Sequence, residues 1–176
     1  MVQNPSSAAN PTVFKPTELP SLQQVAGTYE FQFLLPTNIP AGSQLQKIPL
    51  FRIGQQSDML QIRYVRADGH YLRIKQGAGF AGFSTIWPYA PDSHKGKATV
   101  QGNEAFWMEG NLRATAPPTD PRNPNLVWQP GPLALTWHSG PHPNGRTNAF
   151  LDYTLESDNL TLAQLLAMAN SVQPHH

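Results

Sequence analysis

The sequence predicts an α+β fold: a curved antiparallel sheet of about six to eight strands with a C-terminal helix packed on one face. Stretches of alternating apolar and polar residues recur along the chain and are typical of half-buried strands. Asp-Gly and Gly-Asn dipeptides join two pairs of these stretches, as in hairpins. A helical pattern then follows the last predicted strand. Strands and helix are thus segregated along the chain, as in α+β domains.

The clearest local pattern is a strand followed by a capped helix near the C-terminus. In residues 150–156, Leu151, Tyr153 and Leu155 fall on one face of a predicted strand. Thr161 and Gln164 have the spacing of a capping box, and Leu160 and Leu165 that of a hydrophobic staple. The apolar stripe of the helix comprises Leu162, Leu165, Leu166, Ala169 and Val172. Because so short a helix is unstable alone, we expect this stripe to dock on the sheet.

The remaining strands are predicted from the same alternation. We expect strands at residues 29–35, 45–53, 133–138 and in two hairpins, 60–65 with 71–75 and 98–101 with 104–109. Asp68-Gly69 and Gly102-Asn103 are the predicted turns. Residues 110–132 contain six prolines, and we predict a long loop there because proline cannot donate to a strand ladder.

Composition sets the domain plan and excludes several function classes. We predict a Pro/Asn/Ser-rich linker at 1–20, one domain at 21–172 and a disordered tail or tag remnant at 173–176. A net charge of +1 without a basic cluster argues against nucleic-acid binding. The absence of cysteine excludes disulfides and thiolate metal sites, and no apolar run is long enough to insert into a membrane. Few charges and many prolines suit a loop-rich domain outside the cytoplasm.

Aromatic residues in two predicted loops are the candidate binding surface. Glycines and prolines frame these residues, which are Phe80, Phe83, Trp87, Tyr89 and Trp128. They either form a flat surface for a protein, peptide, sugar or lipid chain, or fold over a sheet edge as a lid. We expect Trp87 to be exposed at the rim and Trp128 to be packed. Trp107 and Trp137 are predicted to be core or sheet-face residues.

No catalytic, metal or cofactor site is predicted. His138 and His142 have the i, i+4 spacing of helix-borne metal ligands, but the intervening glycine and proline forbid that helix, so we interpret them as exposed turn residues. A loop site completed by Asp152 or His94 is the alternative. Gly77–Gly82 fits the pattern of a dinucleotide-binding loop, yet the following residues lack the required helix. We interpret it as a flexible loop.

Three stretches resemble a family of bacterial extracytoplasmic domains of unknown function. They are FLLPTNIPAGSQL (33–45), LQIRYVRADGHYLRIKQG with VQGNEAFW (60–77 and 100–107), and LTWHSG with DYTLESDNLTLAQLLAMANSV (135–140 and 152–172). Domains of that family often form the C-terminal part of anti-sigma factors and related membrane regulators. The resemblance implies no catalytic residues.

The sequence therefore predicts a non-catalytic extracytoplasmic sensory or protein-interaction domain. It would lie in the periplasm or at the cell surface, tethered through a segment outside this chain. The first alternative is a carrier that binds an apolar ligand between sheet and helix, as distantly similar lipoprotein-carrier domains do. A hydrolase is the second alternative.

Overall fold

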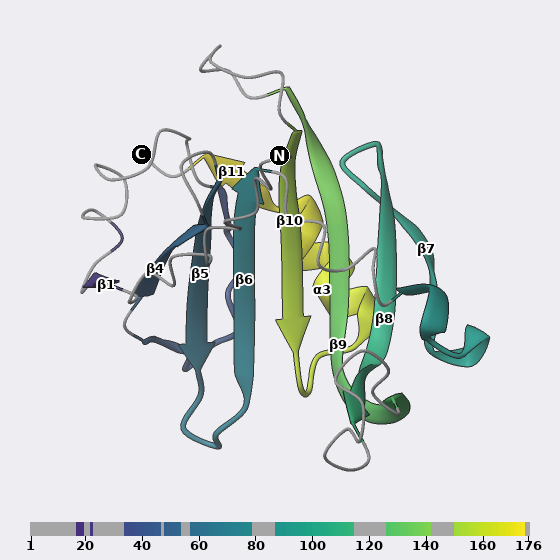
Figure 1. Cartoon of the computed structure of the whole chain (residues 1–176). Helices are drawn as coiled ribbons and strands as arrows, with labels where there is room; N and C mark the ends of the chain where they lie inside the picture. Colours follow the sequence, from purple (N-terminus) through teal and green to yellow (C-terminus); the bar gives the residue numbers. More distant parts are fainter. Residues whose placement is uncertain are drawn as a thin grey trace, which may run out of the picture.

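The computed structural model describes residues 17–19, 22, 34–46, 48–53, 57–78, 87–114, 126–141 and 150–174. Its main sheet has nine strands, in the order β1-β4-β5-β6-β10-β9-β8-β7, with β3 paired to β5. The neighbouring strands described here run antiparallel, and α3 lies behind the sheet (Figure 1). The predicted α+β class, a curved antiparallel sheet with a C-terminal helix, is confirmed.

The described strands range in length from two residues in β3 to 16 in β9. The first half of the chain supplies β1 (Thr17–Leu19), β2 (Leu34–Pro36), β3 (Gln44–Leu45), β4 (Ile48–Ile53), β5 (Ser57–Val65) and β6 (Tyr71–Ala78). Two single-turn 3-10 helices follow, η1 (Trp87–Tyr89) and η2 (Asp92–His94). The second half supplies β7 (Lys95–Val100), β8 (Asn103–Ala114), β9 (Leu126–Pro141), β10 (Phe150–Ser157), α3 (Leu162–Asn170) and β11 (Val172–Pro174).

Both predicted hairpins are present, with one shift of register. Asp68 and Gly69 lie in the turn between β5 and β6, where Gly69 has a φ of 86°. In the second hairpin Val100 pairs with Asn103, so the turn residues are Gln101 and Gly102, at φ 49° and 81°. The prediction placed this turn one residue too late. Two successive positive φ angles are the mark of a type I′ turn.

The C-terminal helix begins as predicted and ends earlier. The Thr161 side chain accepts a hydrogen bond from the Gln164 N–H, and the Gln164 side chain accepts one from the Thr161 N–H, which completes the capping box. The predicted stripe was wrong at its end, because the helix stops at Asn170 and Val172 belongs to β11. Met168, which the stripe omitted, is buried.

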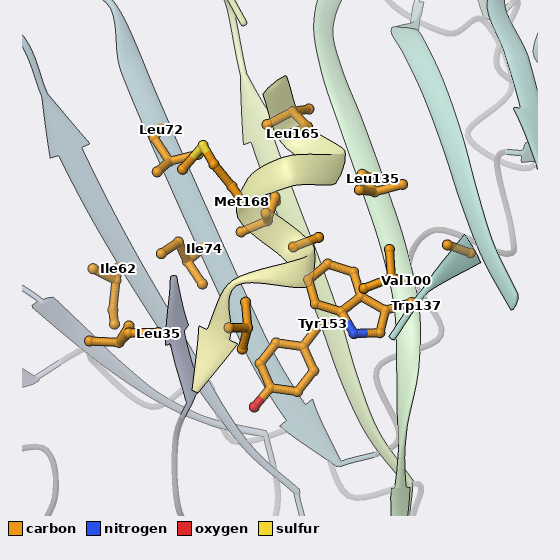
Figure 2. Packing of buried hydrophobic residues seen from close by; sticks show 14 of the residues in the cluster. Leu35, Ile62, Leu72, Ile74, Val100, Leu135, Trp137, Tyr153, Leu165 and Met168 are labelled. Atoms are coloured by element: carbon orange, nitrogen blue, oxygen red, sulfur yellow. The ribbon is translucent and has the colours of Figure 1, made fainter. Parts of the chain in front are cut away.

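One core fills the space between α3 and the sheet (Figure 2). Leu60, Ile74 and Leu155 of the sheet and Leu165 of the helix are each at most 1% exposed. Trp137 stacks on Tyr153 in the neighbouring strand, with ring centroids 5.2 Å apart. Trp137 is thus a core residue, and Trp107 is partly buried against the same cluster.

Buried polar groups attach the small β2–β11 sheet to this core. The Leu34 N–H donates to Gln76 Oε1 at 2.8 Å, and the Gln76 amide donates back to the Leu34 carbonyl. Gln76 is 1% exposed, and these two bonds satisfy its buried amide while they tie β2 to β6. At the end of α3, Asn170 accepts from the Gln101 N–H at 2.8 Å, which ties the helix to the β7–β8 turn.

Three predicted boundaries were wrong. Thr17–Leu19, inside the predicted linker, pairs with β4, and Gln173 and Pro174, inside the predicted tail, pair with β2. The predicted loop at 110–132 contains the end of β8 and the start of β9. Prolines are compatible with pairing here because of a bulge, in which Gly110 of β8 faces Pro130–Pro132 of β9.

Candidate functional site

The sheet has a second face, which we call the open face, on the side away from α3. In β6 the side chains of Leu72, Ile74 and Gln76 are buried toward the helix, so Tyr71, Arg73 and Lys75 alternate onto the open face. Register places Glu156 of β10 opposite Arg73, and Thr154 opposite Lys75. No helix of the described residues packs over this part of β6 and β10.

A groove of about 350 Å³ lies on the open face. Its volume is near the lower end of the range for small-ligand sites, about 300–1,000 Å³. One wall comes from β6 and β10 and comprises Tyr71, Arg73, Lys75, Thr154 and Glu156. The other wall comes from the bulged β8–β9 hairpin and comprises Met108, Gly110, Asn111, Arg113, Pro130, Gly131, Pro132 and Ala134.

The bulge shapes the second wall. Gly110 has a φ of 109°, which L side chains rarely adopt, and a Cβ there would lie 2.5 Å from the Gln129 carbonyl oxygen. The Trp128 ring occupies the space beside it, since the same Cβ would lie 2.7 Å from Trp128 Nε1. The irregular pairing bends the hairpin, as bulges generally do, and Asn111 and Arg113 line the groove beyond it.

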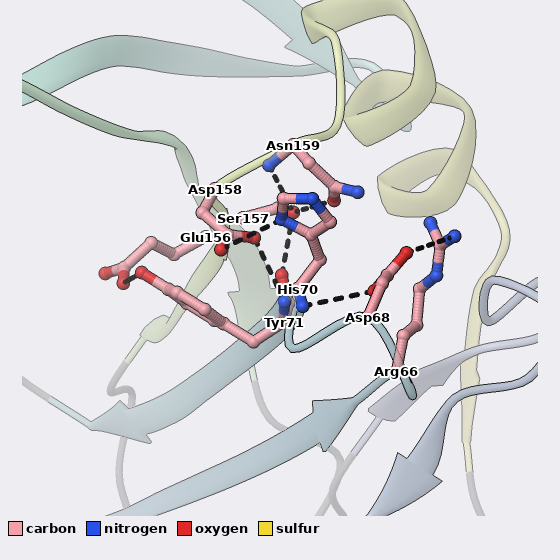
Figure 3. Close-up of polar contacts among 8 residues, drawn as sticks. All are labelled: Arg66, Asp68, His70, Tyr71, Glu156, Ser157, Asp158 and Asn159. Atoms are coloured by element: carbon pink, nitrogen blue, oxygen red, sulfur yellow. Dashed lines mark hydrogen bonds and ion pairs between the residues drawn. The ribbon is translucent and has the colours of Figure 1, made fainter.

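Glu156 is the carboxylate of the first wall, and Figure 3 shows it beside Tyr71. It accepts a hydrogen bond from the Tyr71 hydroxyl at 2.9 Å and forms ion pairs with Arg73 at 3.2 Å and Lys75 at 3.7 Å. Burial, with the neighbouring Glu156 carboxylate, raises the pKa of Tyr71 to about 12, so its hydroxyl remains a donor at neutral pH. The guanidinium groups of Arg63 and Arg73 lie 4.7 and 5.4 Å from the Tyr71 ring centroid.

A second polar cluster lies at the end of the first wall and ties the β5–β6 turn to β10 (Figure 3). Asp158 Oδ1 accepts from the Tyr71 N–H at 3.0 Å, and Oδ2 lies 3.3 Å from His70 Nδ1. Partial burial alone would raise the pKa of Asp158, but these contacts to Tyr71 and His70 outweigh it and the pKa lies below its usual value.

This low pKa gives the fold a testable dependence on pH. A carboxyl group with a lower pKa in the folded state stabilises that state above its unfolded pKa of about 3.9, and the stabilisation is lost as pH falls through the folded pKa. We expect Asp158→Asn to lower the free energy of unfolding by about 1 kcal/mol at pH 7. The difference from the unchanged protein should shrink below about pH 4.

Urea denaturation at pH 7, 5 and 3 measures this effect. Asp92→Asn is the matched control, because the Asp92 side chain is 99% exposed, and it should leave the free energy of unfolding nearly unchanged. A difference for Asp158→Asn that persists undiminished at pH 3 would show that the ionised carboxylate is not what stabilises this corner.

Of the predicted aromatic residues, the three that the structure describes, Trp87, Tyr89 and Trp128, do not line this groove. Trp87 is half-buried rather than exposed, because its ring meets Phe106 edge-on with centroids 5.5 Å apart and Lys95 Nζ lies 4.9 Å from its centroid. Trp128 is half-buried beside Gly110. Tyr89 is 69% exposed. Phe80 and Phe83 lie outside the described residues.

The histidines are placed in separate pairs. His138 Nδ1 contacts the Asp152 carboxylate on the neighbouring strand, and His94 Nδ1 lies 3.4 Å from Glu109 Oε2. His142 lies outside the described residues. Within the part of the chain that the structure describes, no three His, Cys, Asp or Glu side chains converge as a metal site would require.

Comparisons with known proteins found no match. No protein-family model, curated protein or solved structure matches this chain. The similarity to extracytoplasmic domains of regulators therefore rests on the sequence motifs alone. Among the described residues, no helix is long and apolar enough to cross a membrane.

Sequence reasoning missed the groove, although part of the signal was available. Tyr71, Arg73 and Lys75 are three successive outward positions of a predicted strand, and none is apolar aliphatic. Their meeting with Glu156 depends on β6 pairing with β10, which lies about 80 residues later in the chain. Local patterns carry no information on that pairing.

Proposed function

We propose that this chain is a non-catalytic domain that binds a partner protein through the open face of its sheet. The observation that carries the proposal is the groove, in which Tyr71 and two cations face a partly apolar wall, without a covering helix among the described residues. Clefts that combine apolar lining with a few convergent polar groups are the usual location of binding sites. The motif resemblance supports a place outside the cytoplasm, in a membrane-associated regulator.

The packed core weighs against the carrier alternative. A carrier needs an apolar cavity between sheet and helix, whereas Leu165, Met168 and Ala169 of α3 are at most 4% exposed and belong to one cluster with the sheet side chains. An apolar ligand would have to displace these side chains. The described groove lies on the opposite face and has charged groups in its first wall.

The separated polar pairs weigh against the hydrolase alternative. His138 pairs with Asp152 and His94 pairs with Glu109, and neither pair lines the groove. Glu156 already accepts a hydrogen bond from Tyr71 and forms ion pairs with Arg73 and Lys75, which suits a fixed structural carboxylate better than a general base.

Position-specific photo-crosslinking tests the proposal. A photoreactive amino acid replaces Asn111, which is exposed at the groove, or Ala167, which is exposed on α3 and serves as the matched control. In cells that produce the full-length protein, we expect a discrete protein adduct from position 111 and not from position 167. Mass spectrometry identifies the adduct, and purified partner is then titrated by calorimetry.

The adduct supports the proposal if Arg113→Glu, on the groove wall, weakens binding of the purified partner. Equal adducts from positions 111 and 167, or adducts from 167 alone, would reject the open face as the binding surface.

A further inference from the structure

The groove concentrates positive charge. Arg73, Lys75 and Arg113 line it with one carboxylate, Glu156, which leaves a surplus of two positive charges, whereas the whole chain has a formal net charge of +1. Charges of one sign in a concave site reinforce one another because low-dielectric walls focus the field. The surplus therefore favours an anionic ligand.

Glu156 shows how the first wall holds a carboxylate. One hydroxyl, one guanidinium and one ammonium group converge on it from Tyr71, Arg73 and Lys75. The Glu156 side chain is 13% exposed, but Arg73 and Lys75 remain 28% and 21% exposed. Their donors can therefore reach a second acid from outside, and charge-assisted bonds of this kind are stronger than neutral ones.

The second wall adds an apolar surface and one further cation. Across the groove from the ion pairs, the accessible apolar surface comes from Pro130 and Pro132, while Met108 and Ala134 are buried beneath it. Arg113, in the same wall, is exposed. A free inorganic anion would leave the apolar surface unused. A ligand that fits both walls carries a carboxylate next to an apolar group.

We propose that the groove binds an acidic peptide segment in which an Asp or Glu side chain adjoins an apolar one. The inference rests on the proposed function and names the chemistry of the partner. The ligand carboxylate lies between Arg73, Lys75 and Arg113, and the apolar side chain packs on Pro130 and Pro132, the accessible apolar residues of the second wall. A membrane or nucleic acid fits less well, because the cations of the first wall are recessed and few.

Calorimetry with two synthetic peptides tests this chemistry. The probe is acetyl-Ala-Leu-Asp-Leu-Glu-Ala-amide, and the matched control replaces its acids with Asn and Gln. At about 50 mM salt, where the Debye length exceeds 10 Å, we expect the acidic peptide to bind roughly ten-fold more tightly. Raising the salt concentration should reduce this advantage.

Two variants should change the affinity in opposite directions. Arg113→Gln removes an exposed cation and should weaken binding of the acidic peptide by up to about five-fold, the upper end for one exposed charge pair. Glu156→Gln keeps an acceptor for Tyr71 but removes the competing negative charge, so it should strengthen binding about three-fold. Lys97→Gln is the control, because Lys97 is an exposed cation of β7 outside the groove, and it should leave the affinity unchanged.

These directions separate binding from structural damage. If Glu156 served the fold alone, Glu156→Gln would weaken or not affect binding, and urea midpoints of the variants show whether each is folded. Equal affinity for the acidic and neutral peptides would overturn the inference. Inorganic phosphate or phosphatidylglycerol vesicles that bind as tightly, with the same dependence on Arg113, would overturn it too, since the groove would then be a general anion site. If the acidic peptide shows no preference but the crosslink from position 111 still forms, the acidic chemistry is rejected while the proposed binding of a partner protein is not.

Discussion

Replacing Leu165 with alanine is expected to lower the free energy of unfolding by about 2–5 kcal/mol, the range for a buried leucine. Leu165 has no exposed surface and lies where α3 meets the sheet (Figure 2). The helix has nine residues, too few to be stable alone, so its formation depends on this contact. Urea denaturation followed by circular dichroism measures the change.

Two neighbours serve as controls for this substitution. Leu166 is half-buried, so Leu166→Ala should cost clearly less than Leu165→Ala, and Ala167→Ser at an exposed position should change the free energy of unfolding by less than about 0.5 kcal/mol. A loss below about 0.5 kcal/mol for Leu165→Ala would show that α3 does not close the core.

The elements that were predicted correctly are those specified by neighbouring residues. Thr161 and Gln164 cap the helix through bonds that span three positions, so their spacing in the sequence was sufficient. Asp68 and Gly69 likewise specify a turn whose two strands adjoin it. Burial of Tyr153 and Leu155 followed from alternation, because one face of a paired strand must meet the core.

The errors occur where distant residues decide the local structure. Pro130 and Pro132 appeared incompatible with a strand. Gly110, some 20 residues earlier, has a positive φ, and at this bulge it alone faces the three residues 130–132 of β9. Thr17–Leu19 is too short to show a strand pattern in the sequence, and it forms a strand by pairing with Ile48–Leu50 of β4. The candidate groove combines both causes, since one wall needs the β6–β10 pairing and the other needs the bulge.

Replacing Gly110 with alanine is expected to lower the free energy of unfolding by about 3 kcal/mol. A φ of 109° is strained for any L side chain, which costs about 1–2 kcal/mol, and the added Cβ would overlap the Gln129 carbonyl and the Trp128 ring, which adds about 1–3 kcal/mol. Because the clashing atoms include backbone, a side-chain rotation alone cannot relieve the overlap. The chain must instead change the bulge, which should shift the fluorescence of Trp128 and displace Arg113 from the groove.

Gly102→Ala is the matched control, because Gly102 also has a positive φ, 81°, but a Cβ there would meet nothing within 4 Å. It should therefore cost the backbone strain alone, about 1–2 kcal/mol, and leave the acidic-peptide affinity unchanged. Urea denaturation ranks the two variants, and calorimetry with the acidic peptide reports on the groove. Equal losses of stability, with unchanged peptide binding in both, would mean that crowding at Gly110 neither shapes the bulge nor positions the wall that carries Arg113.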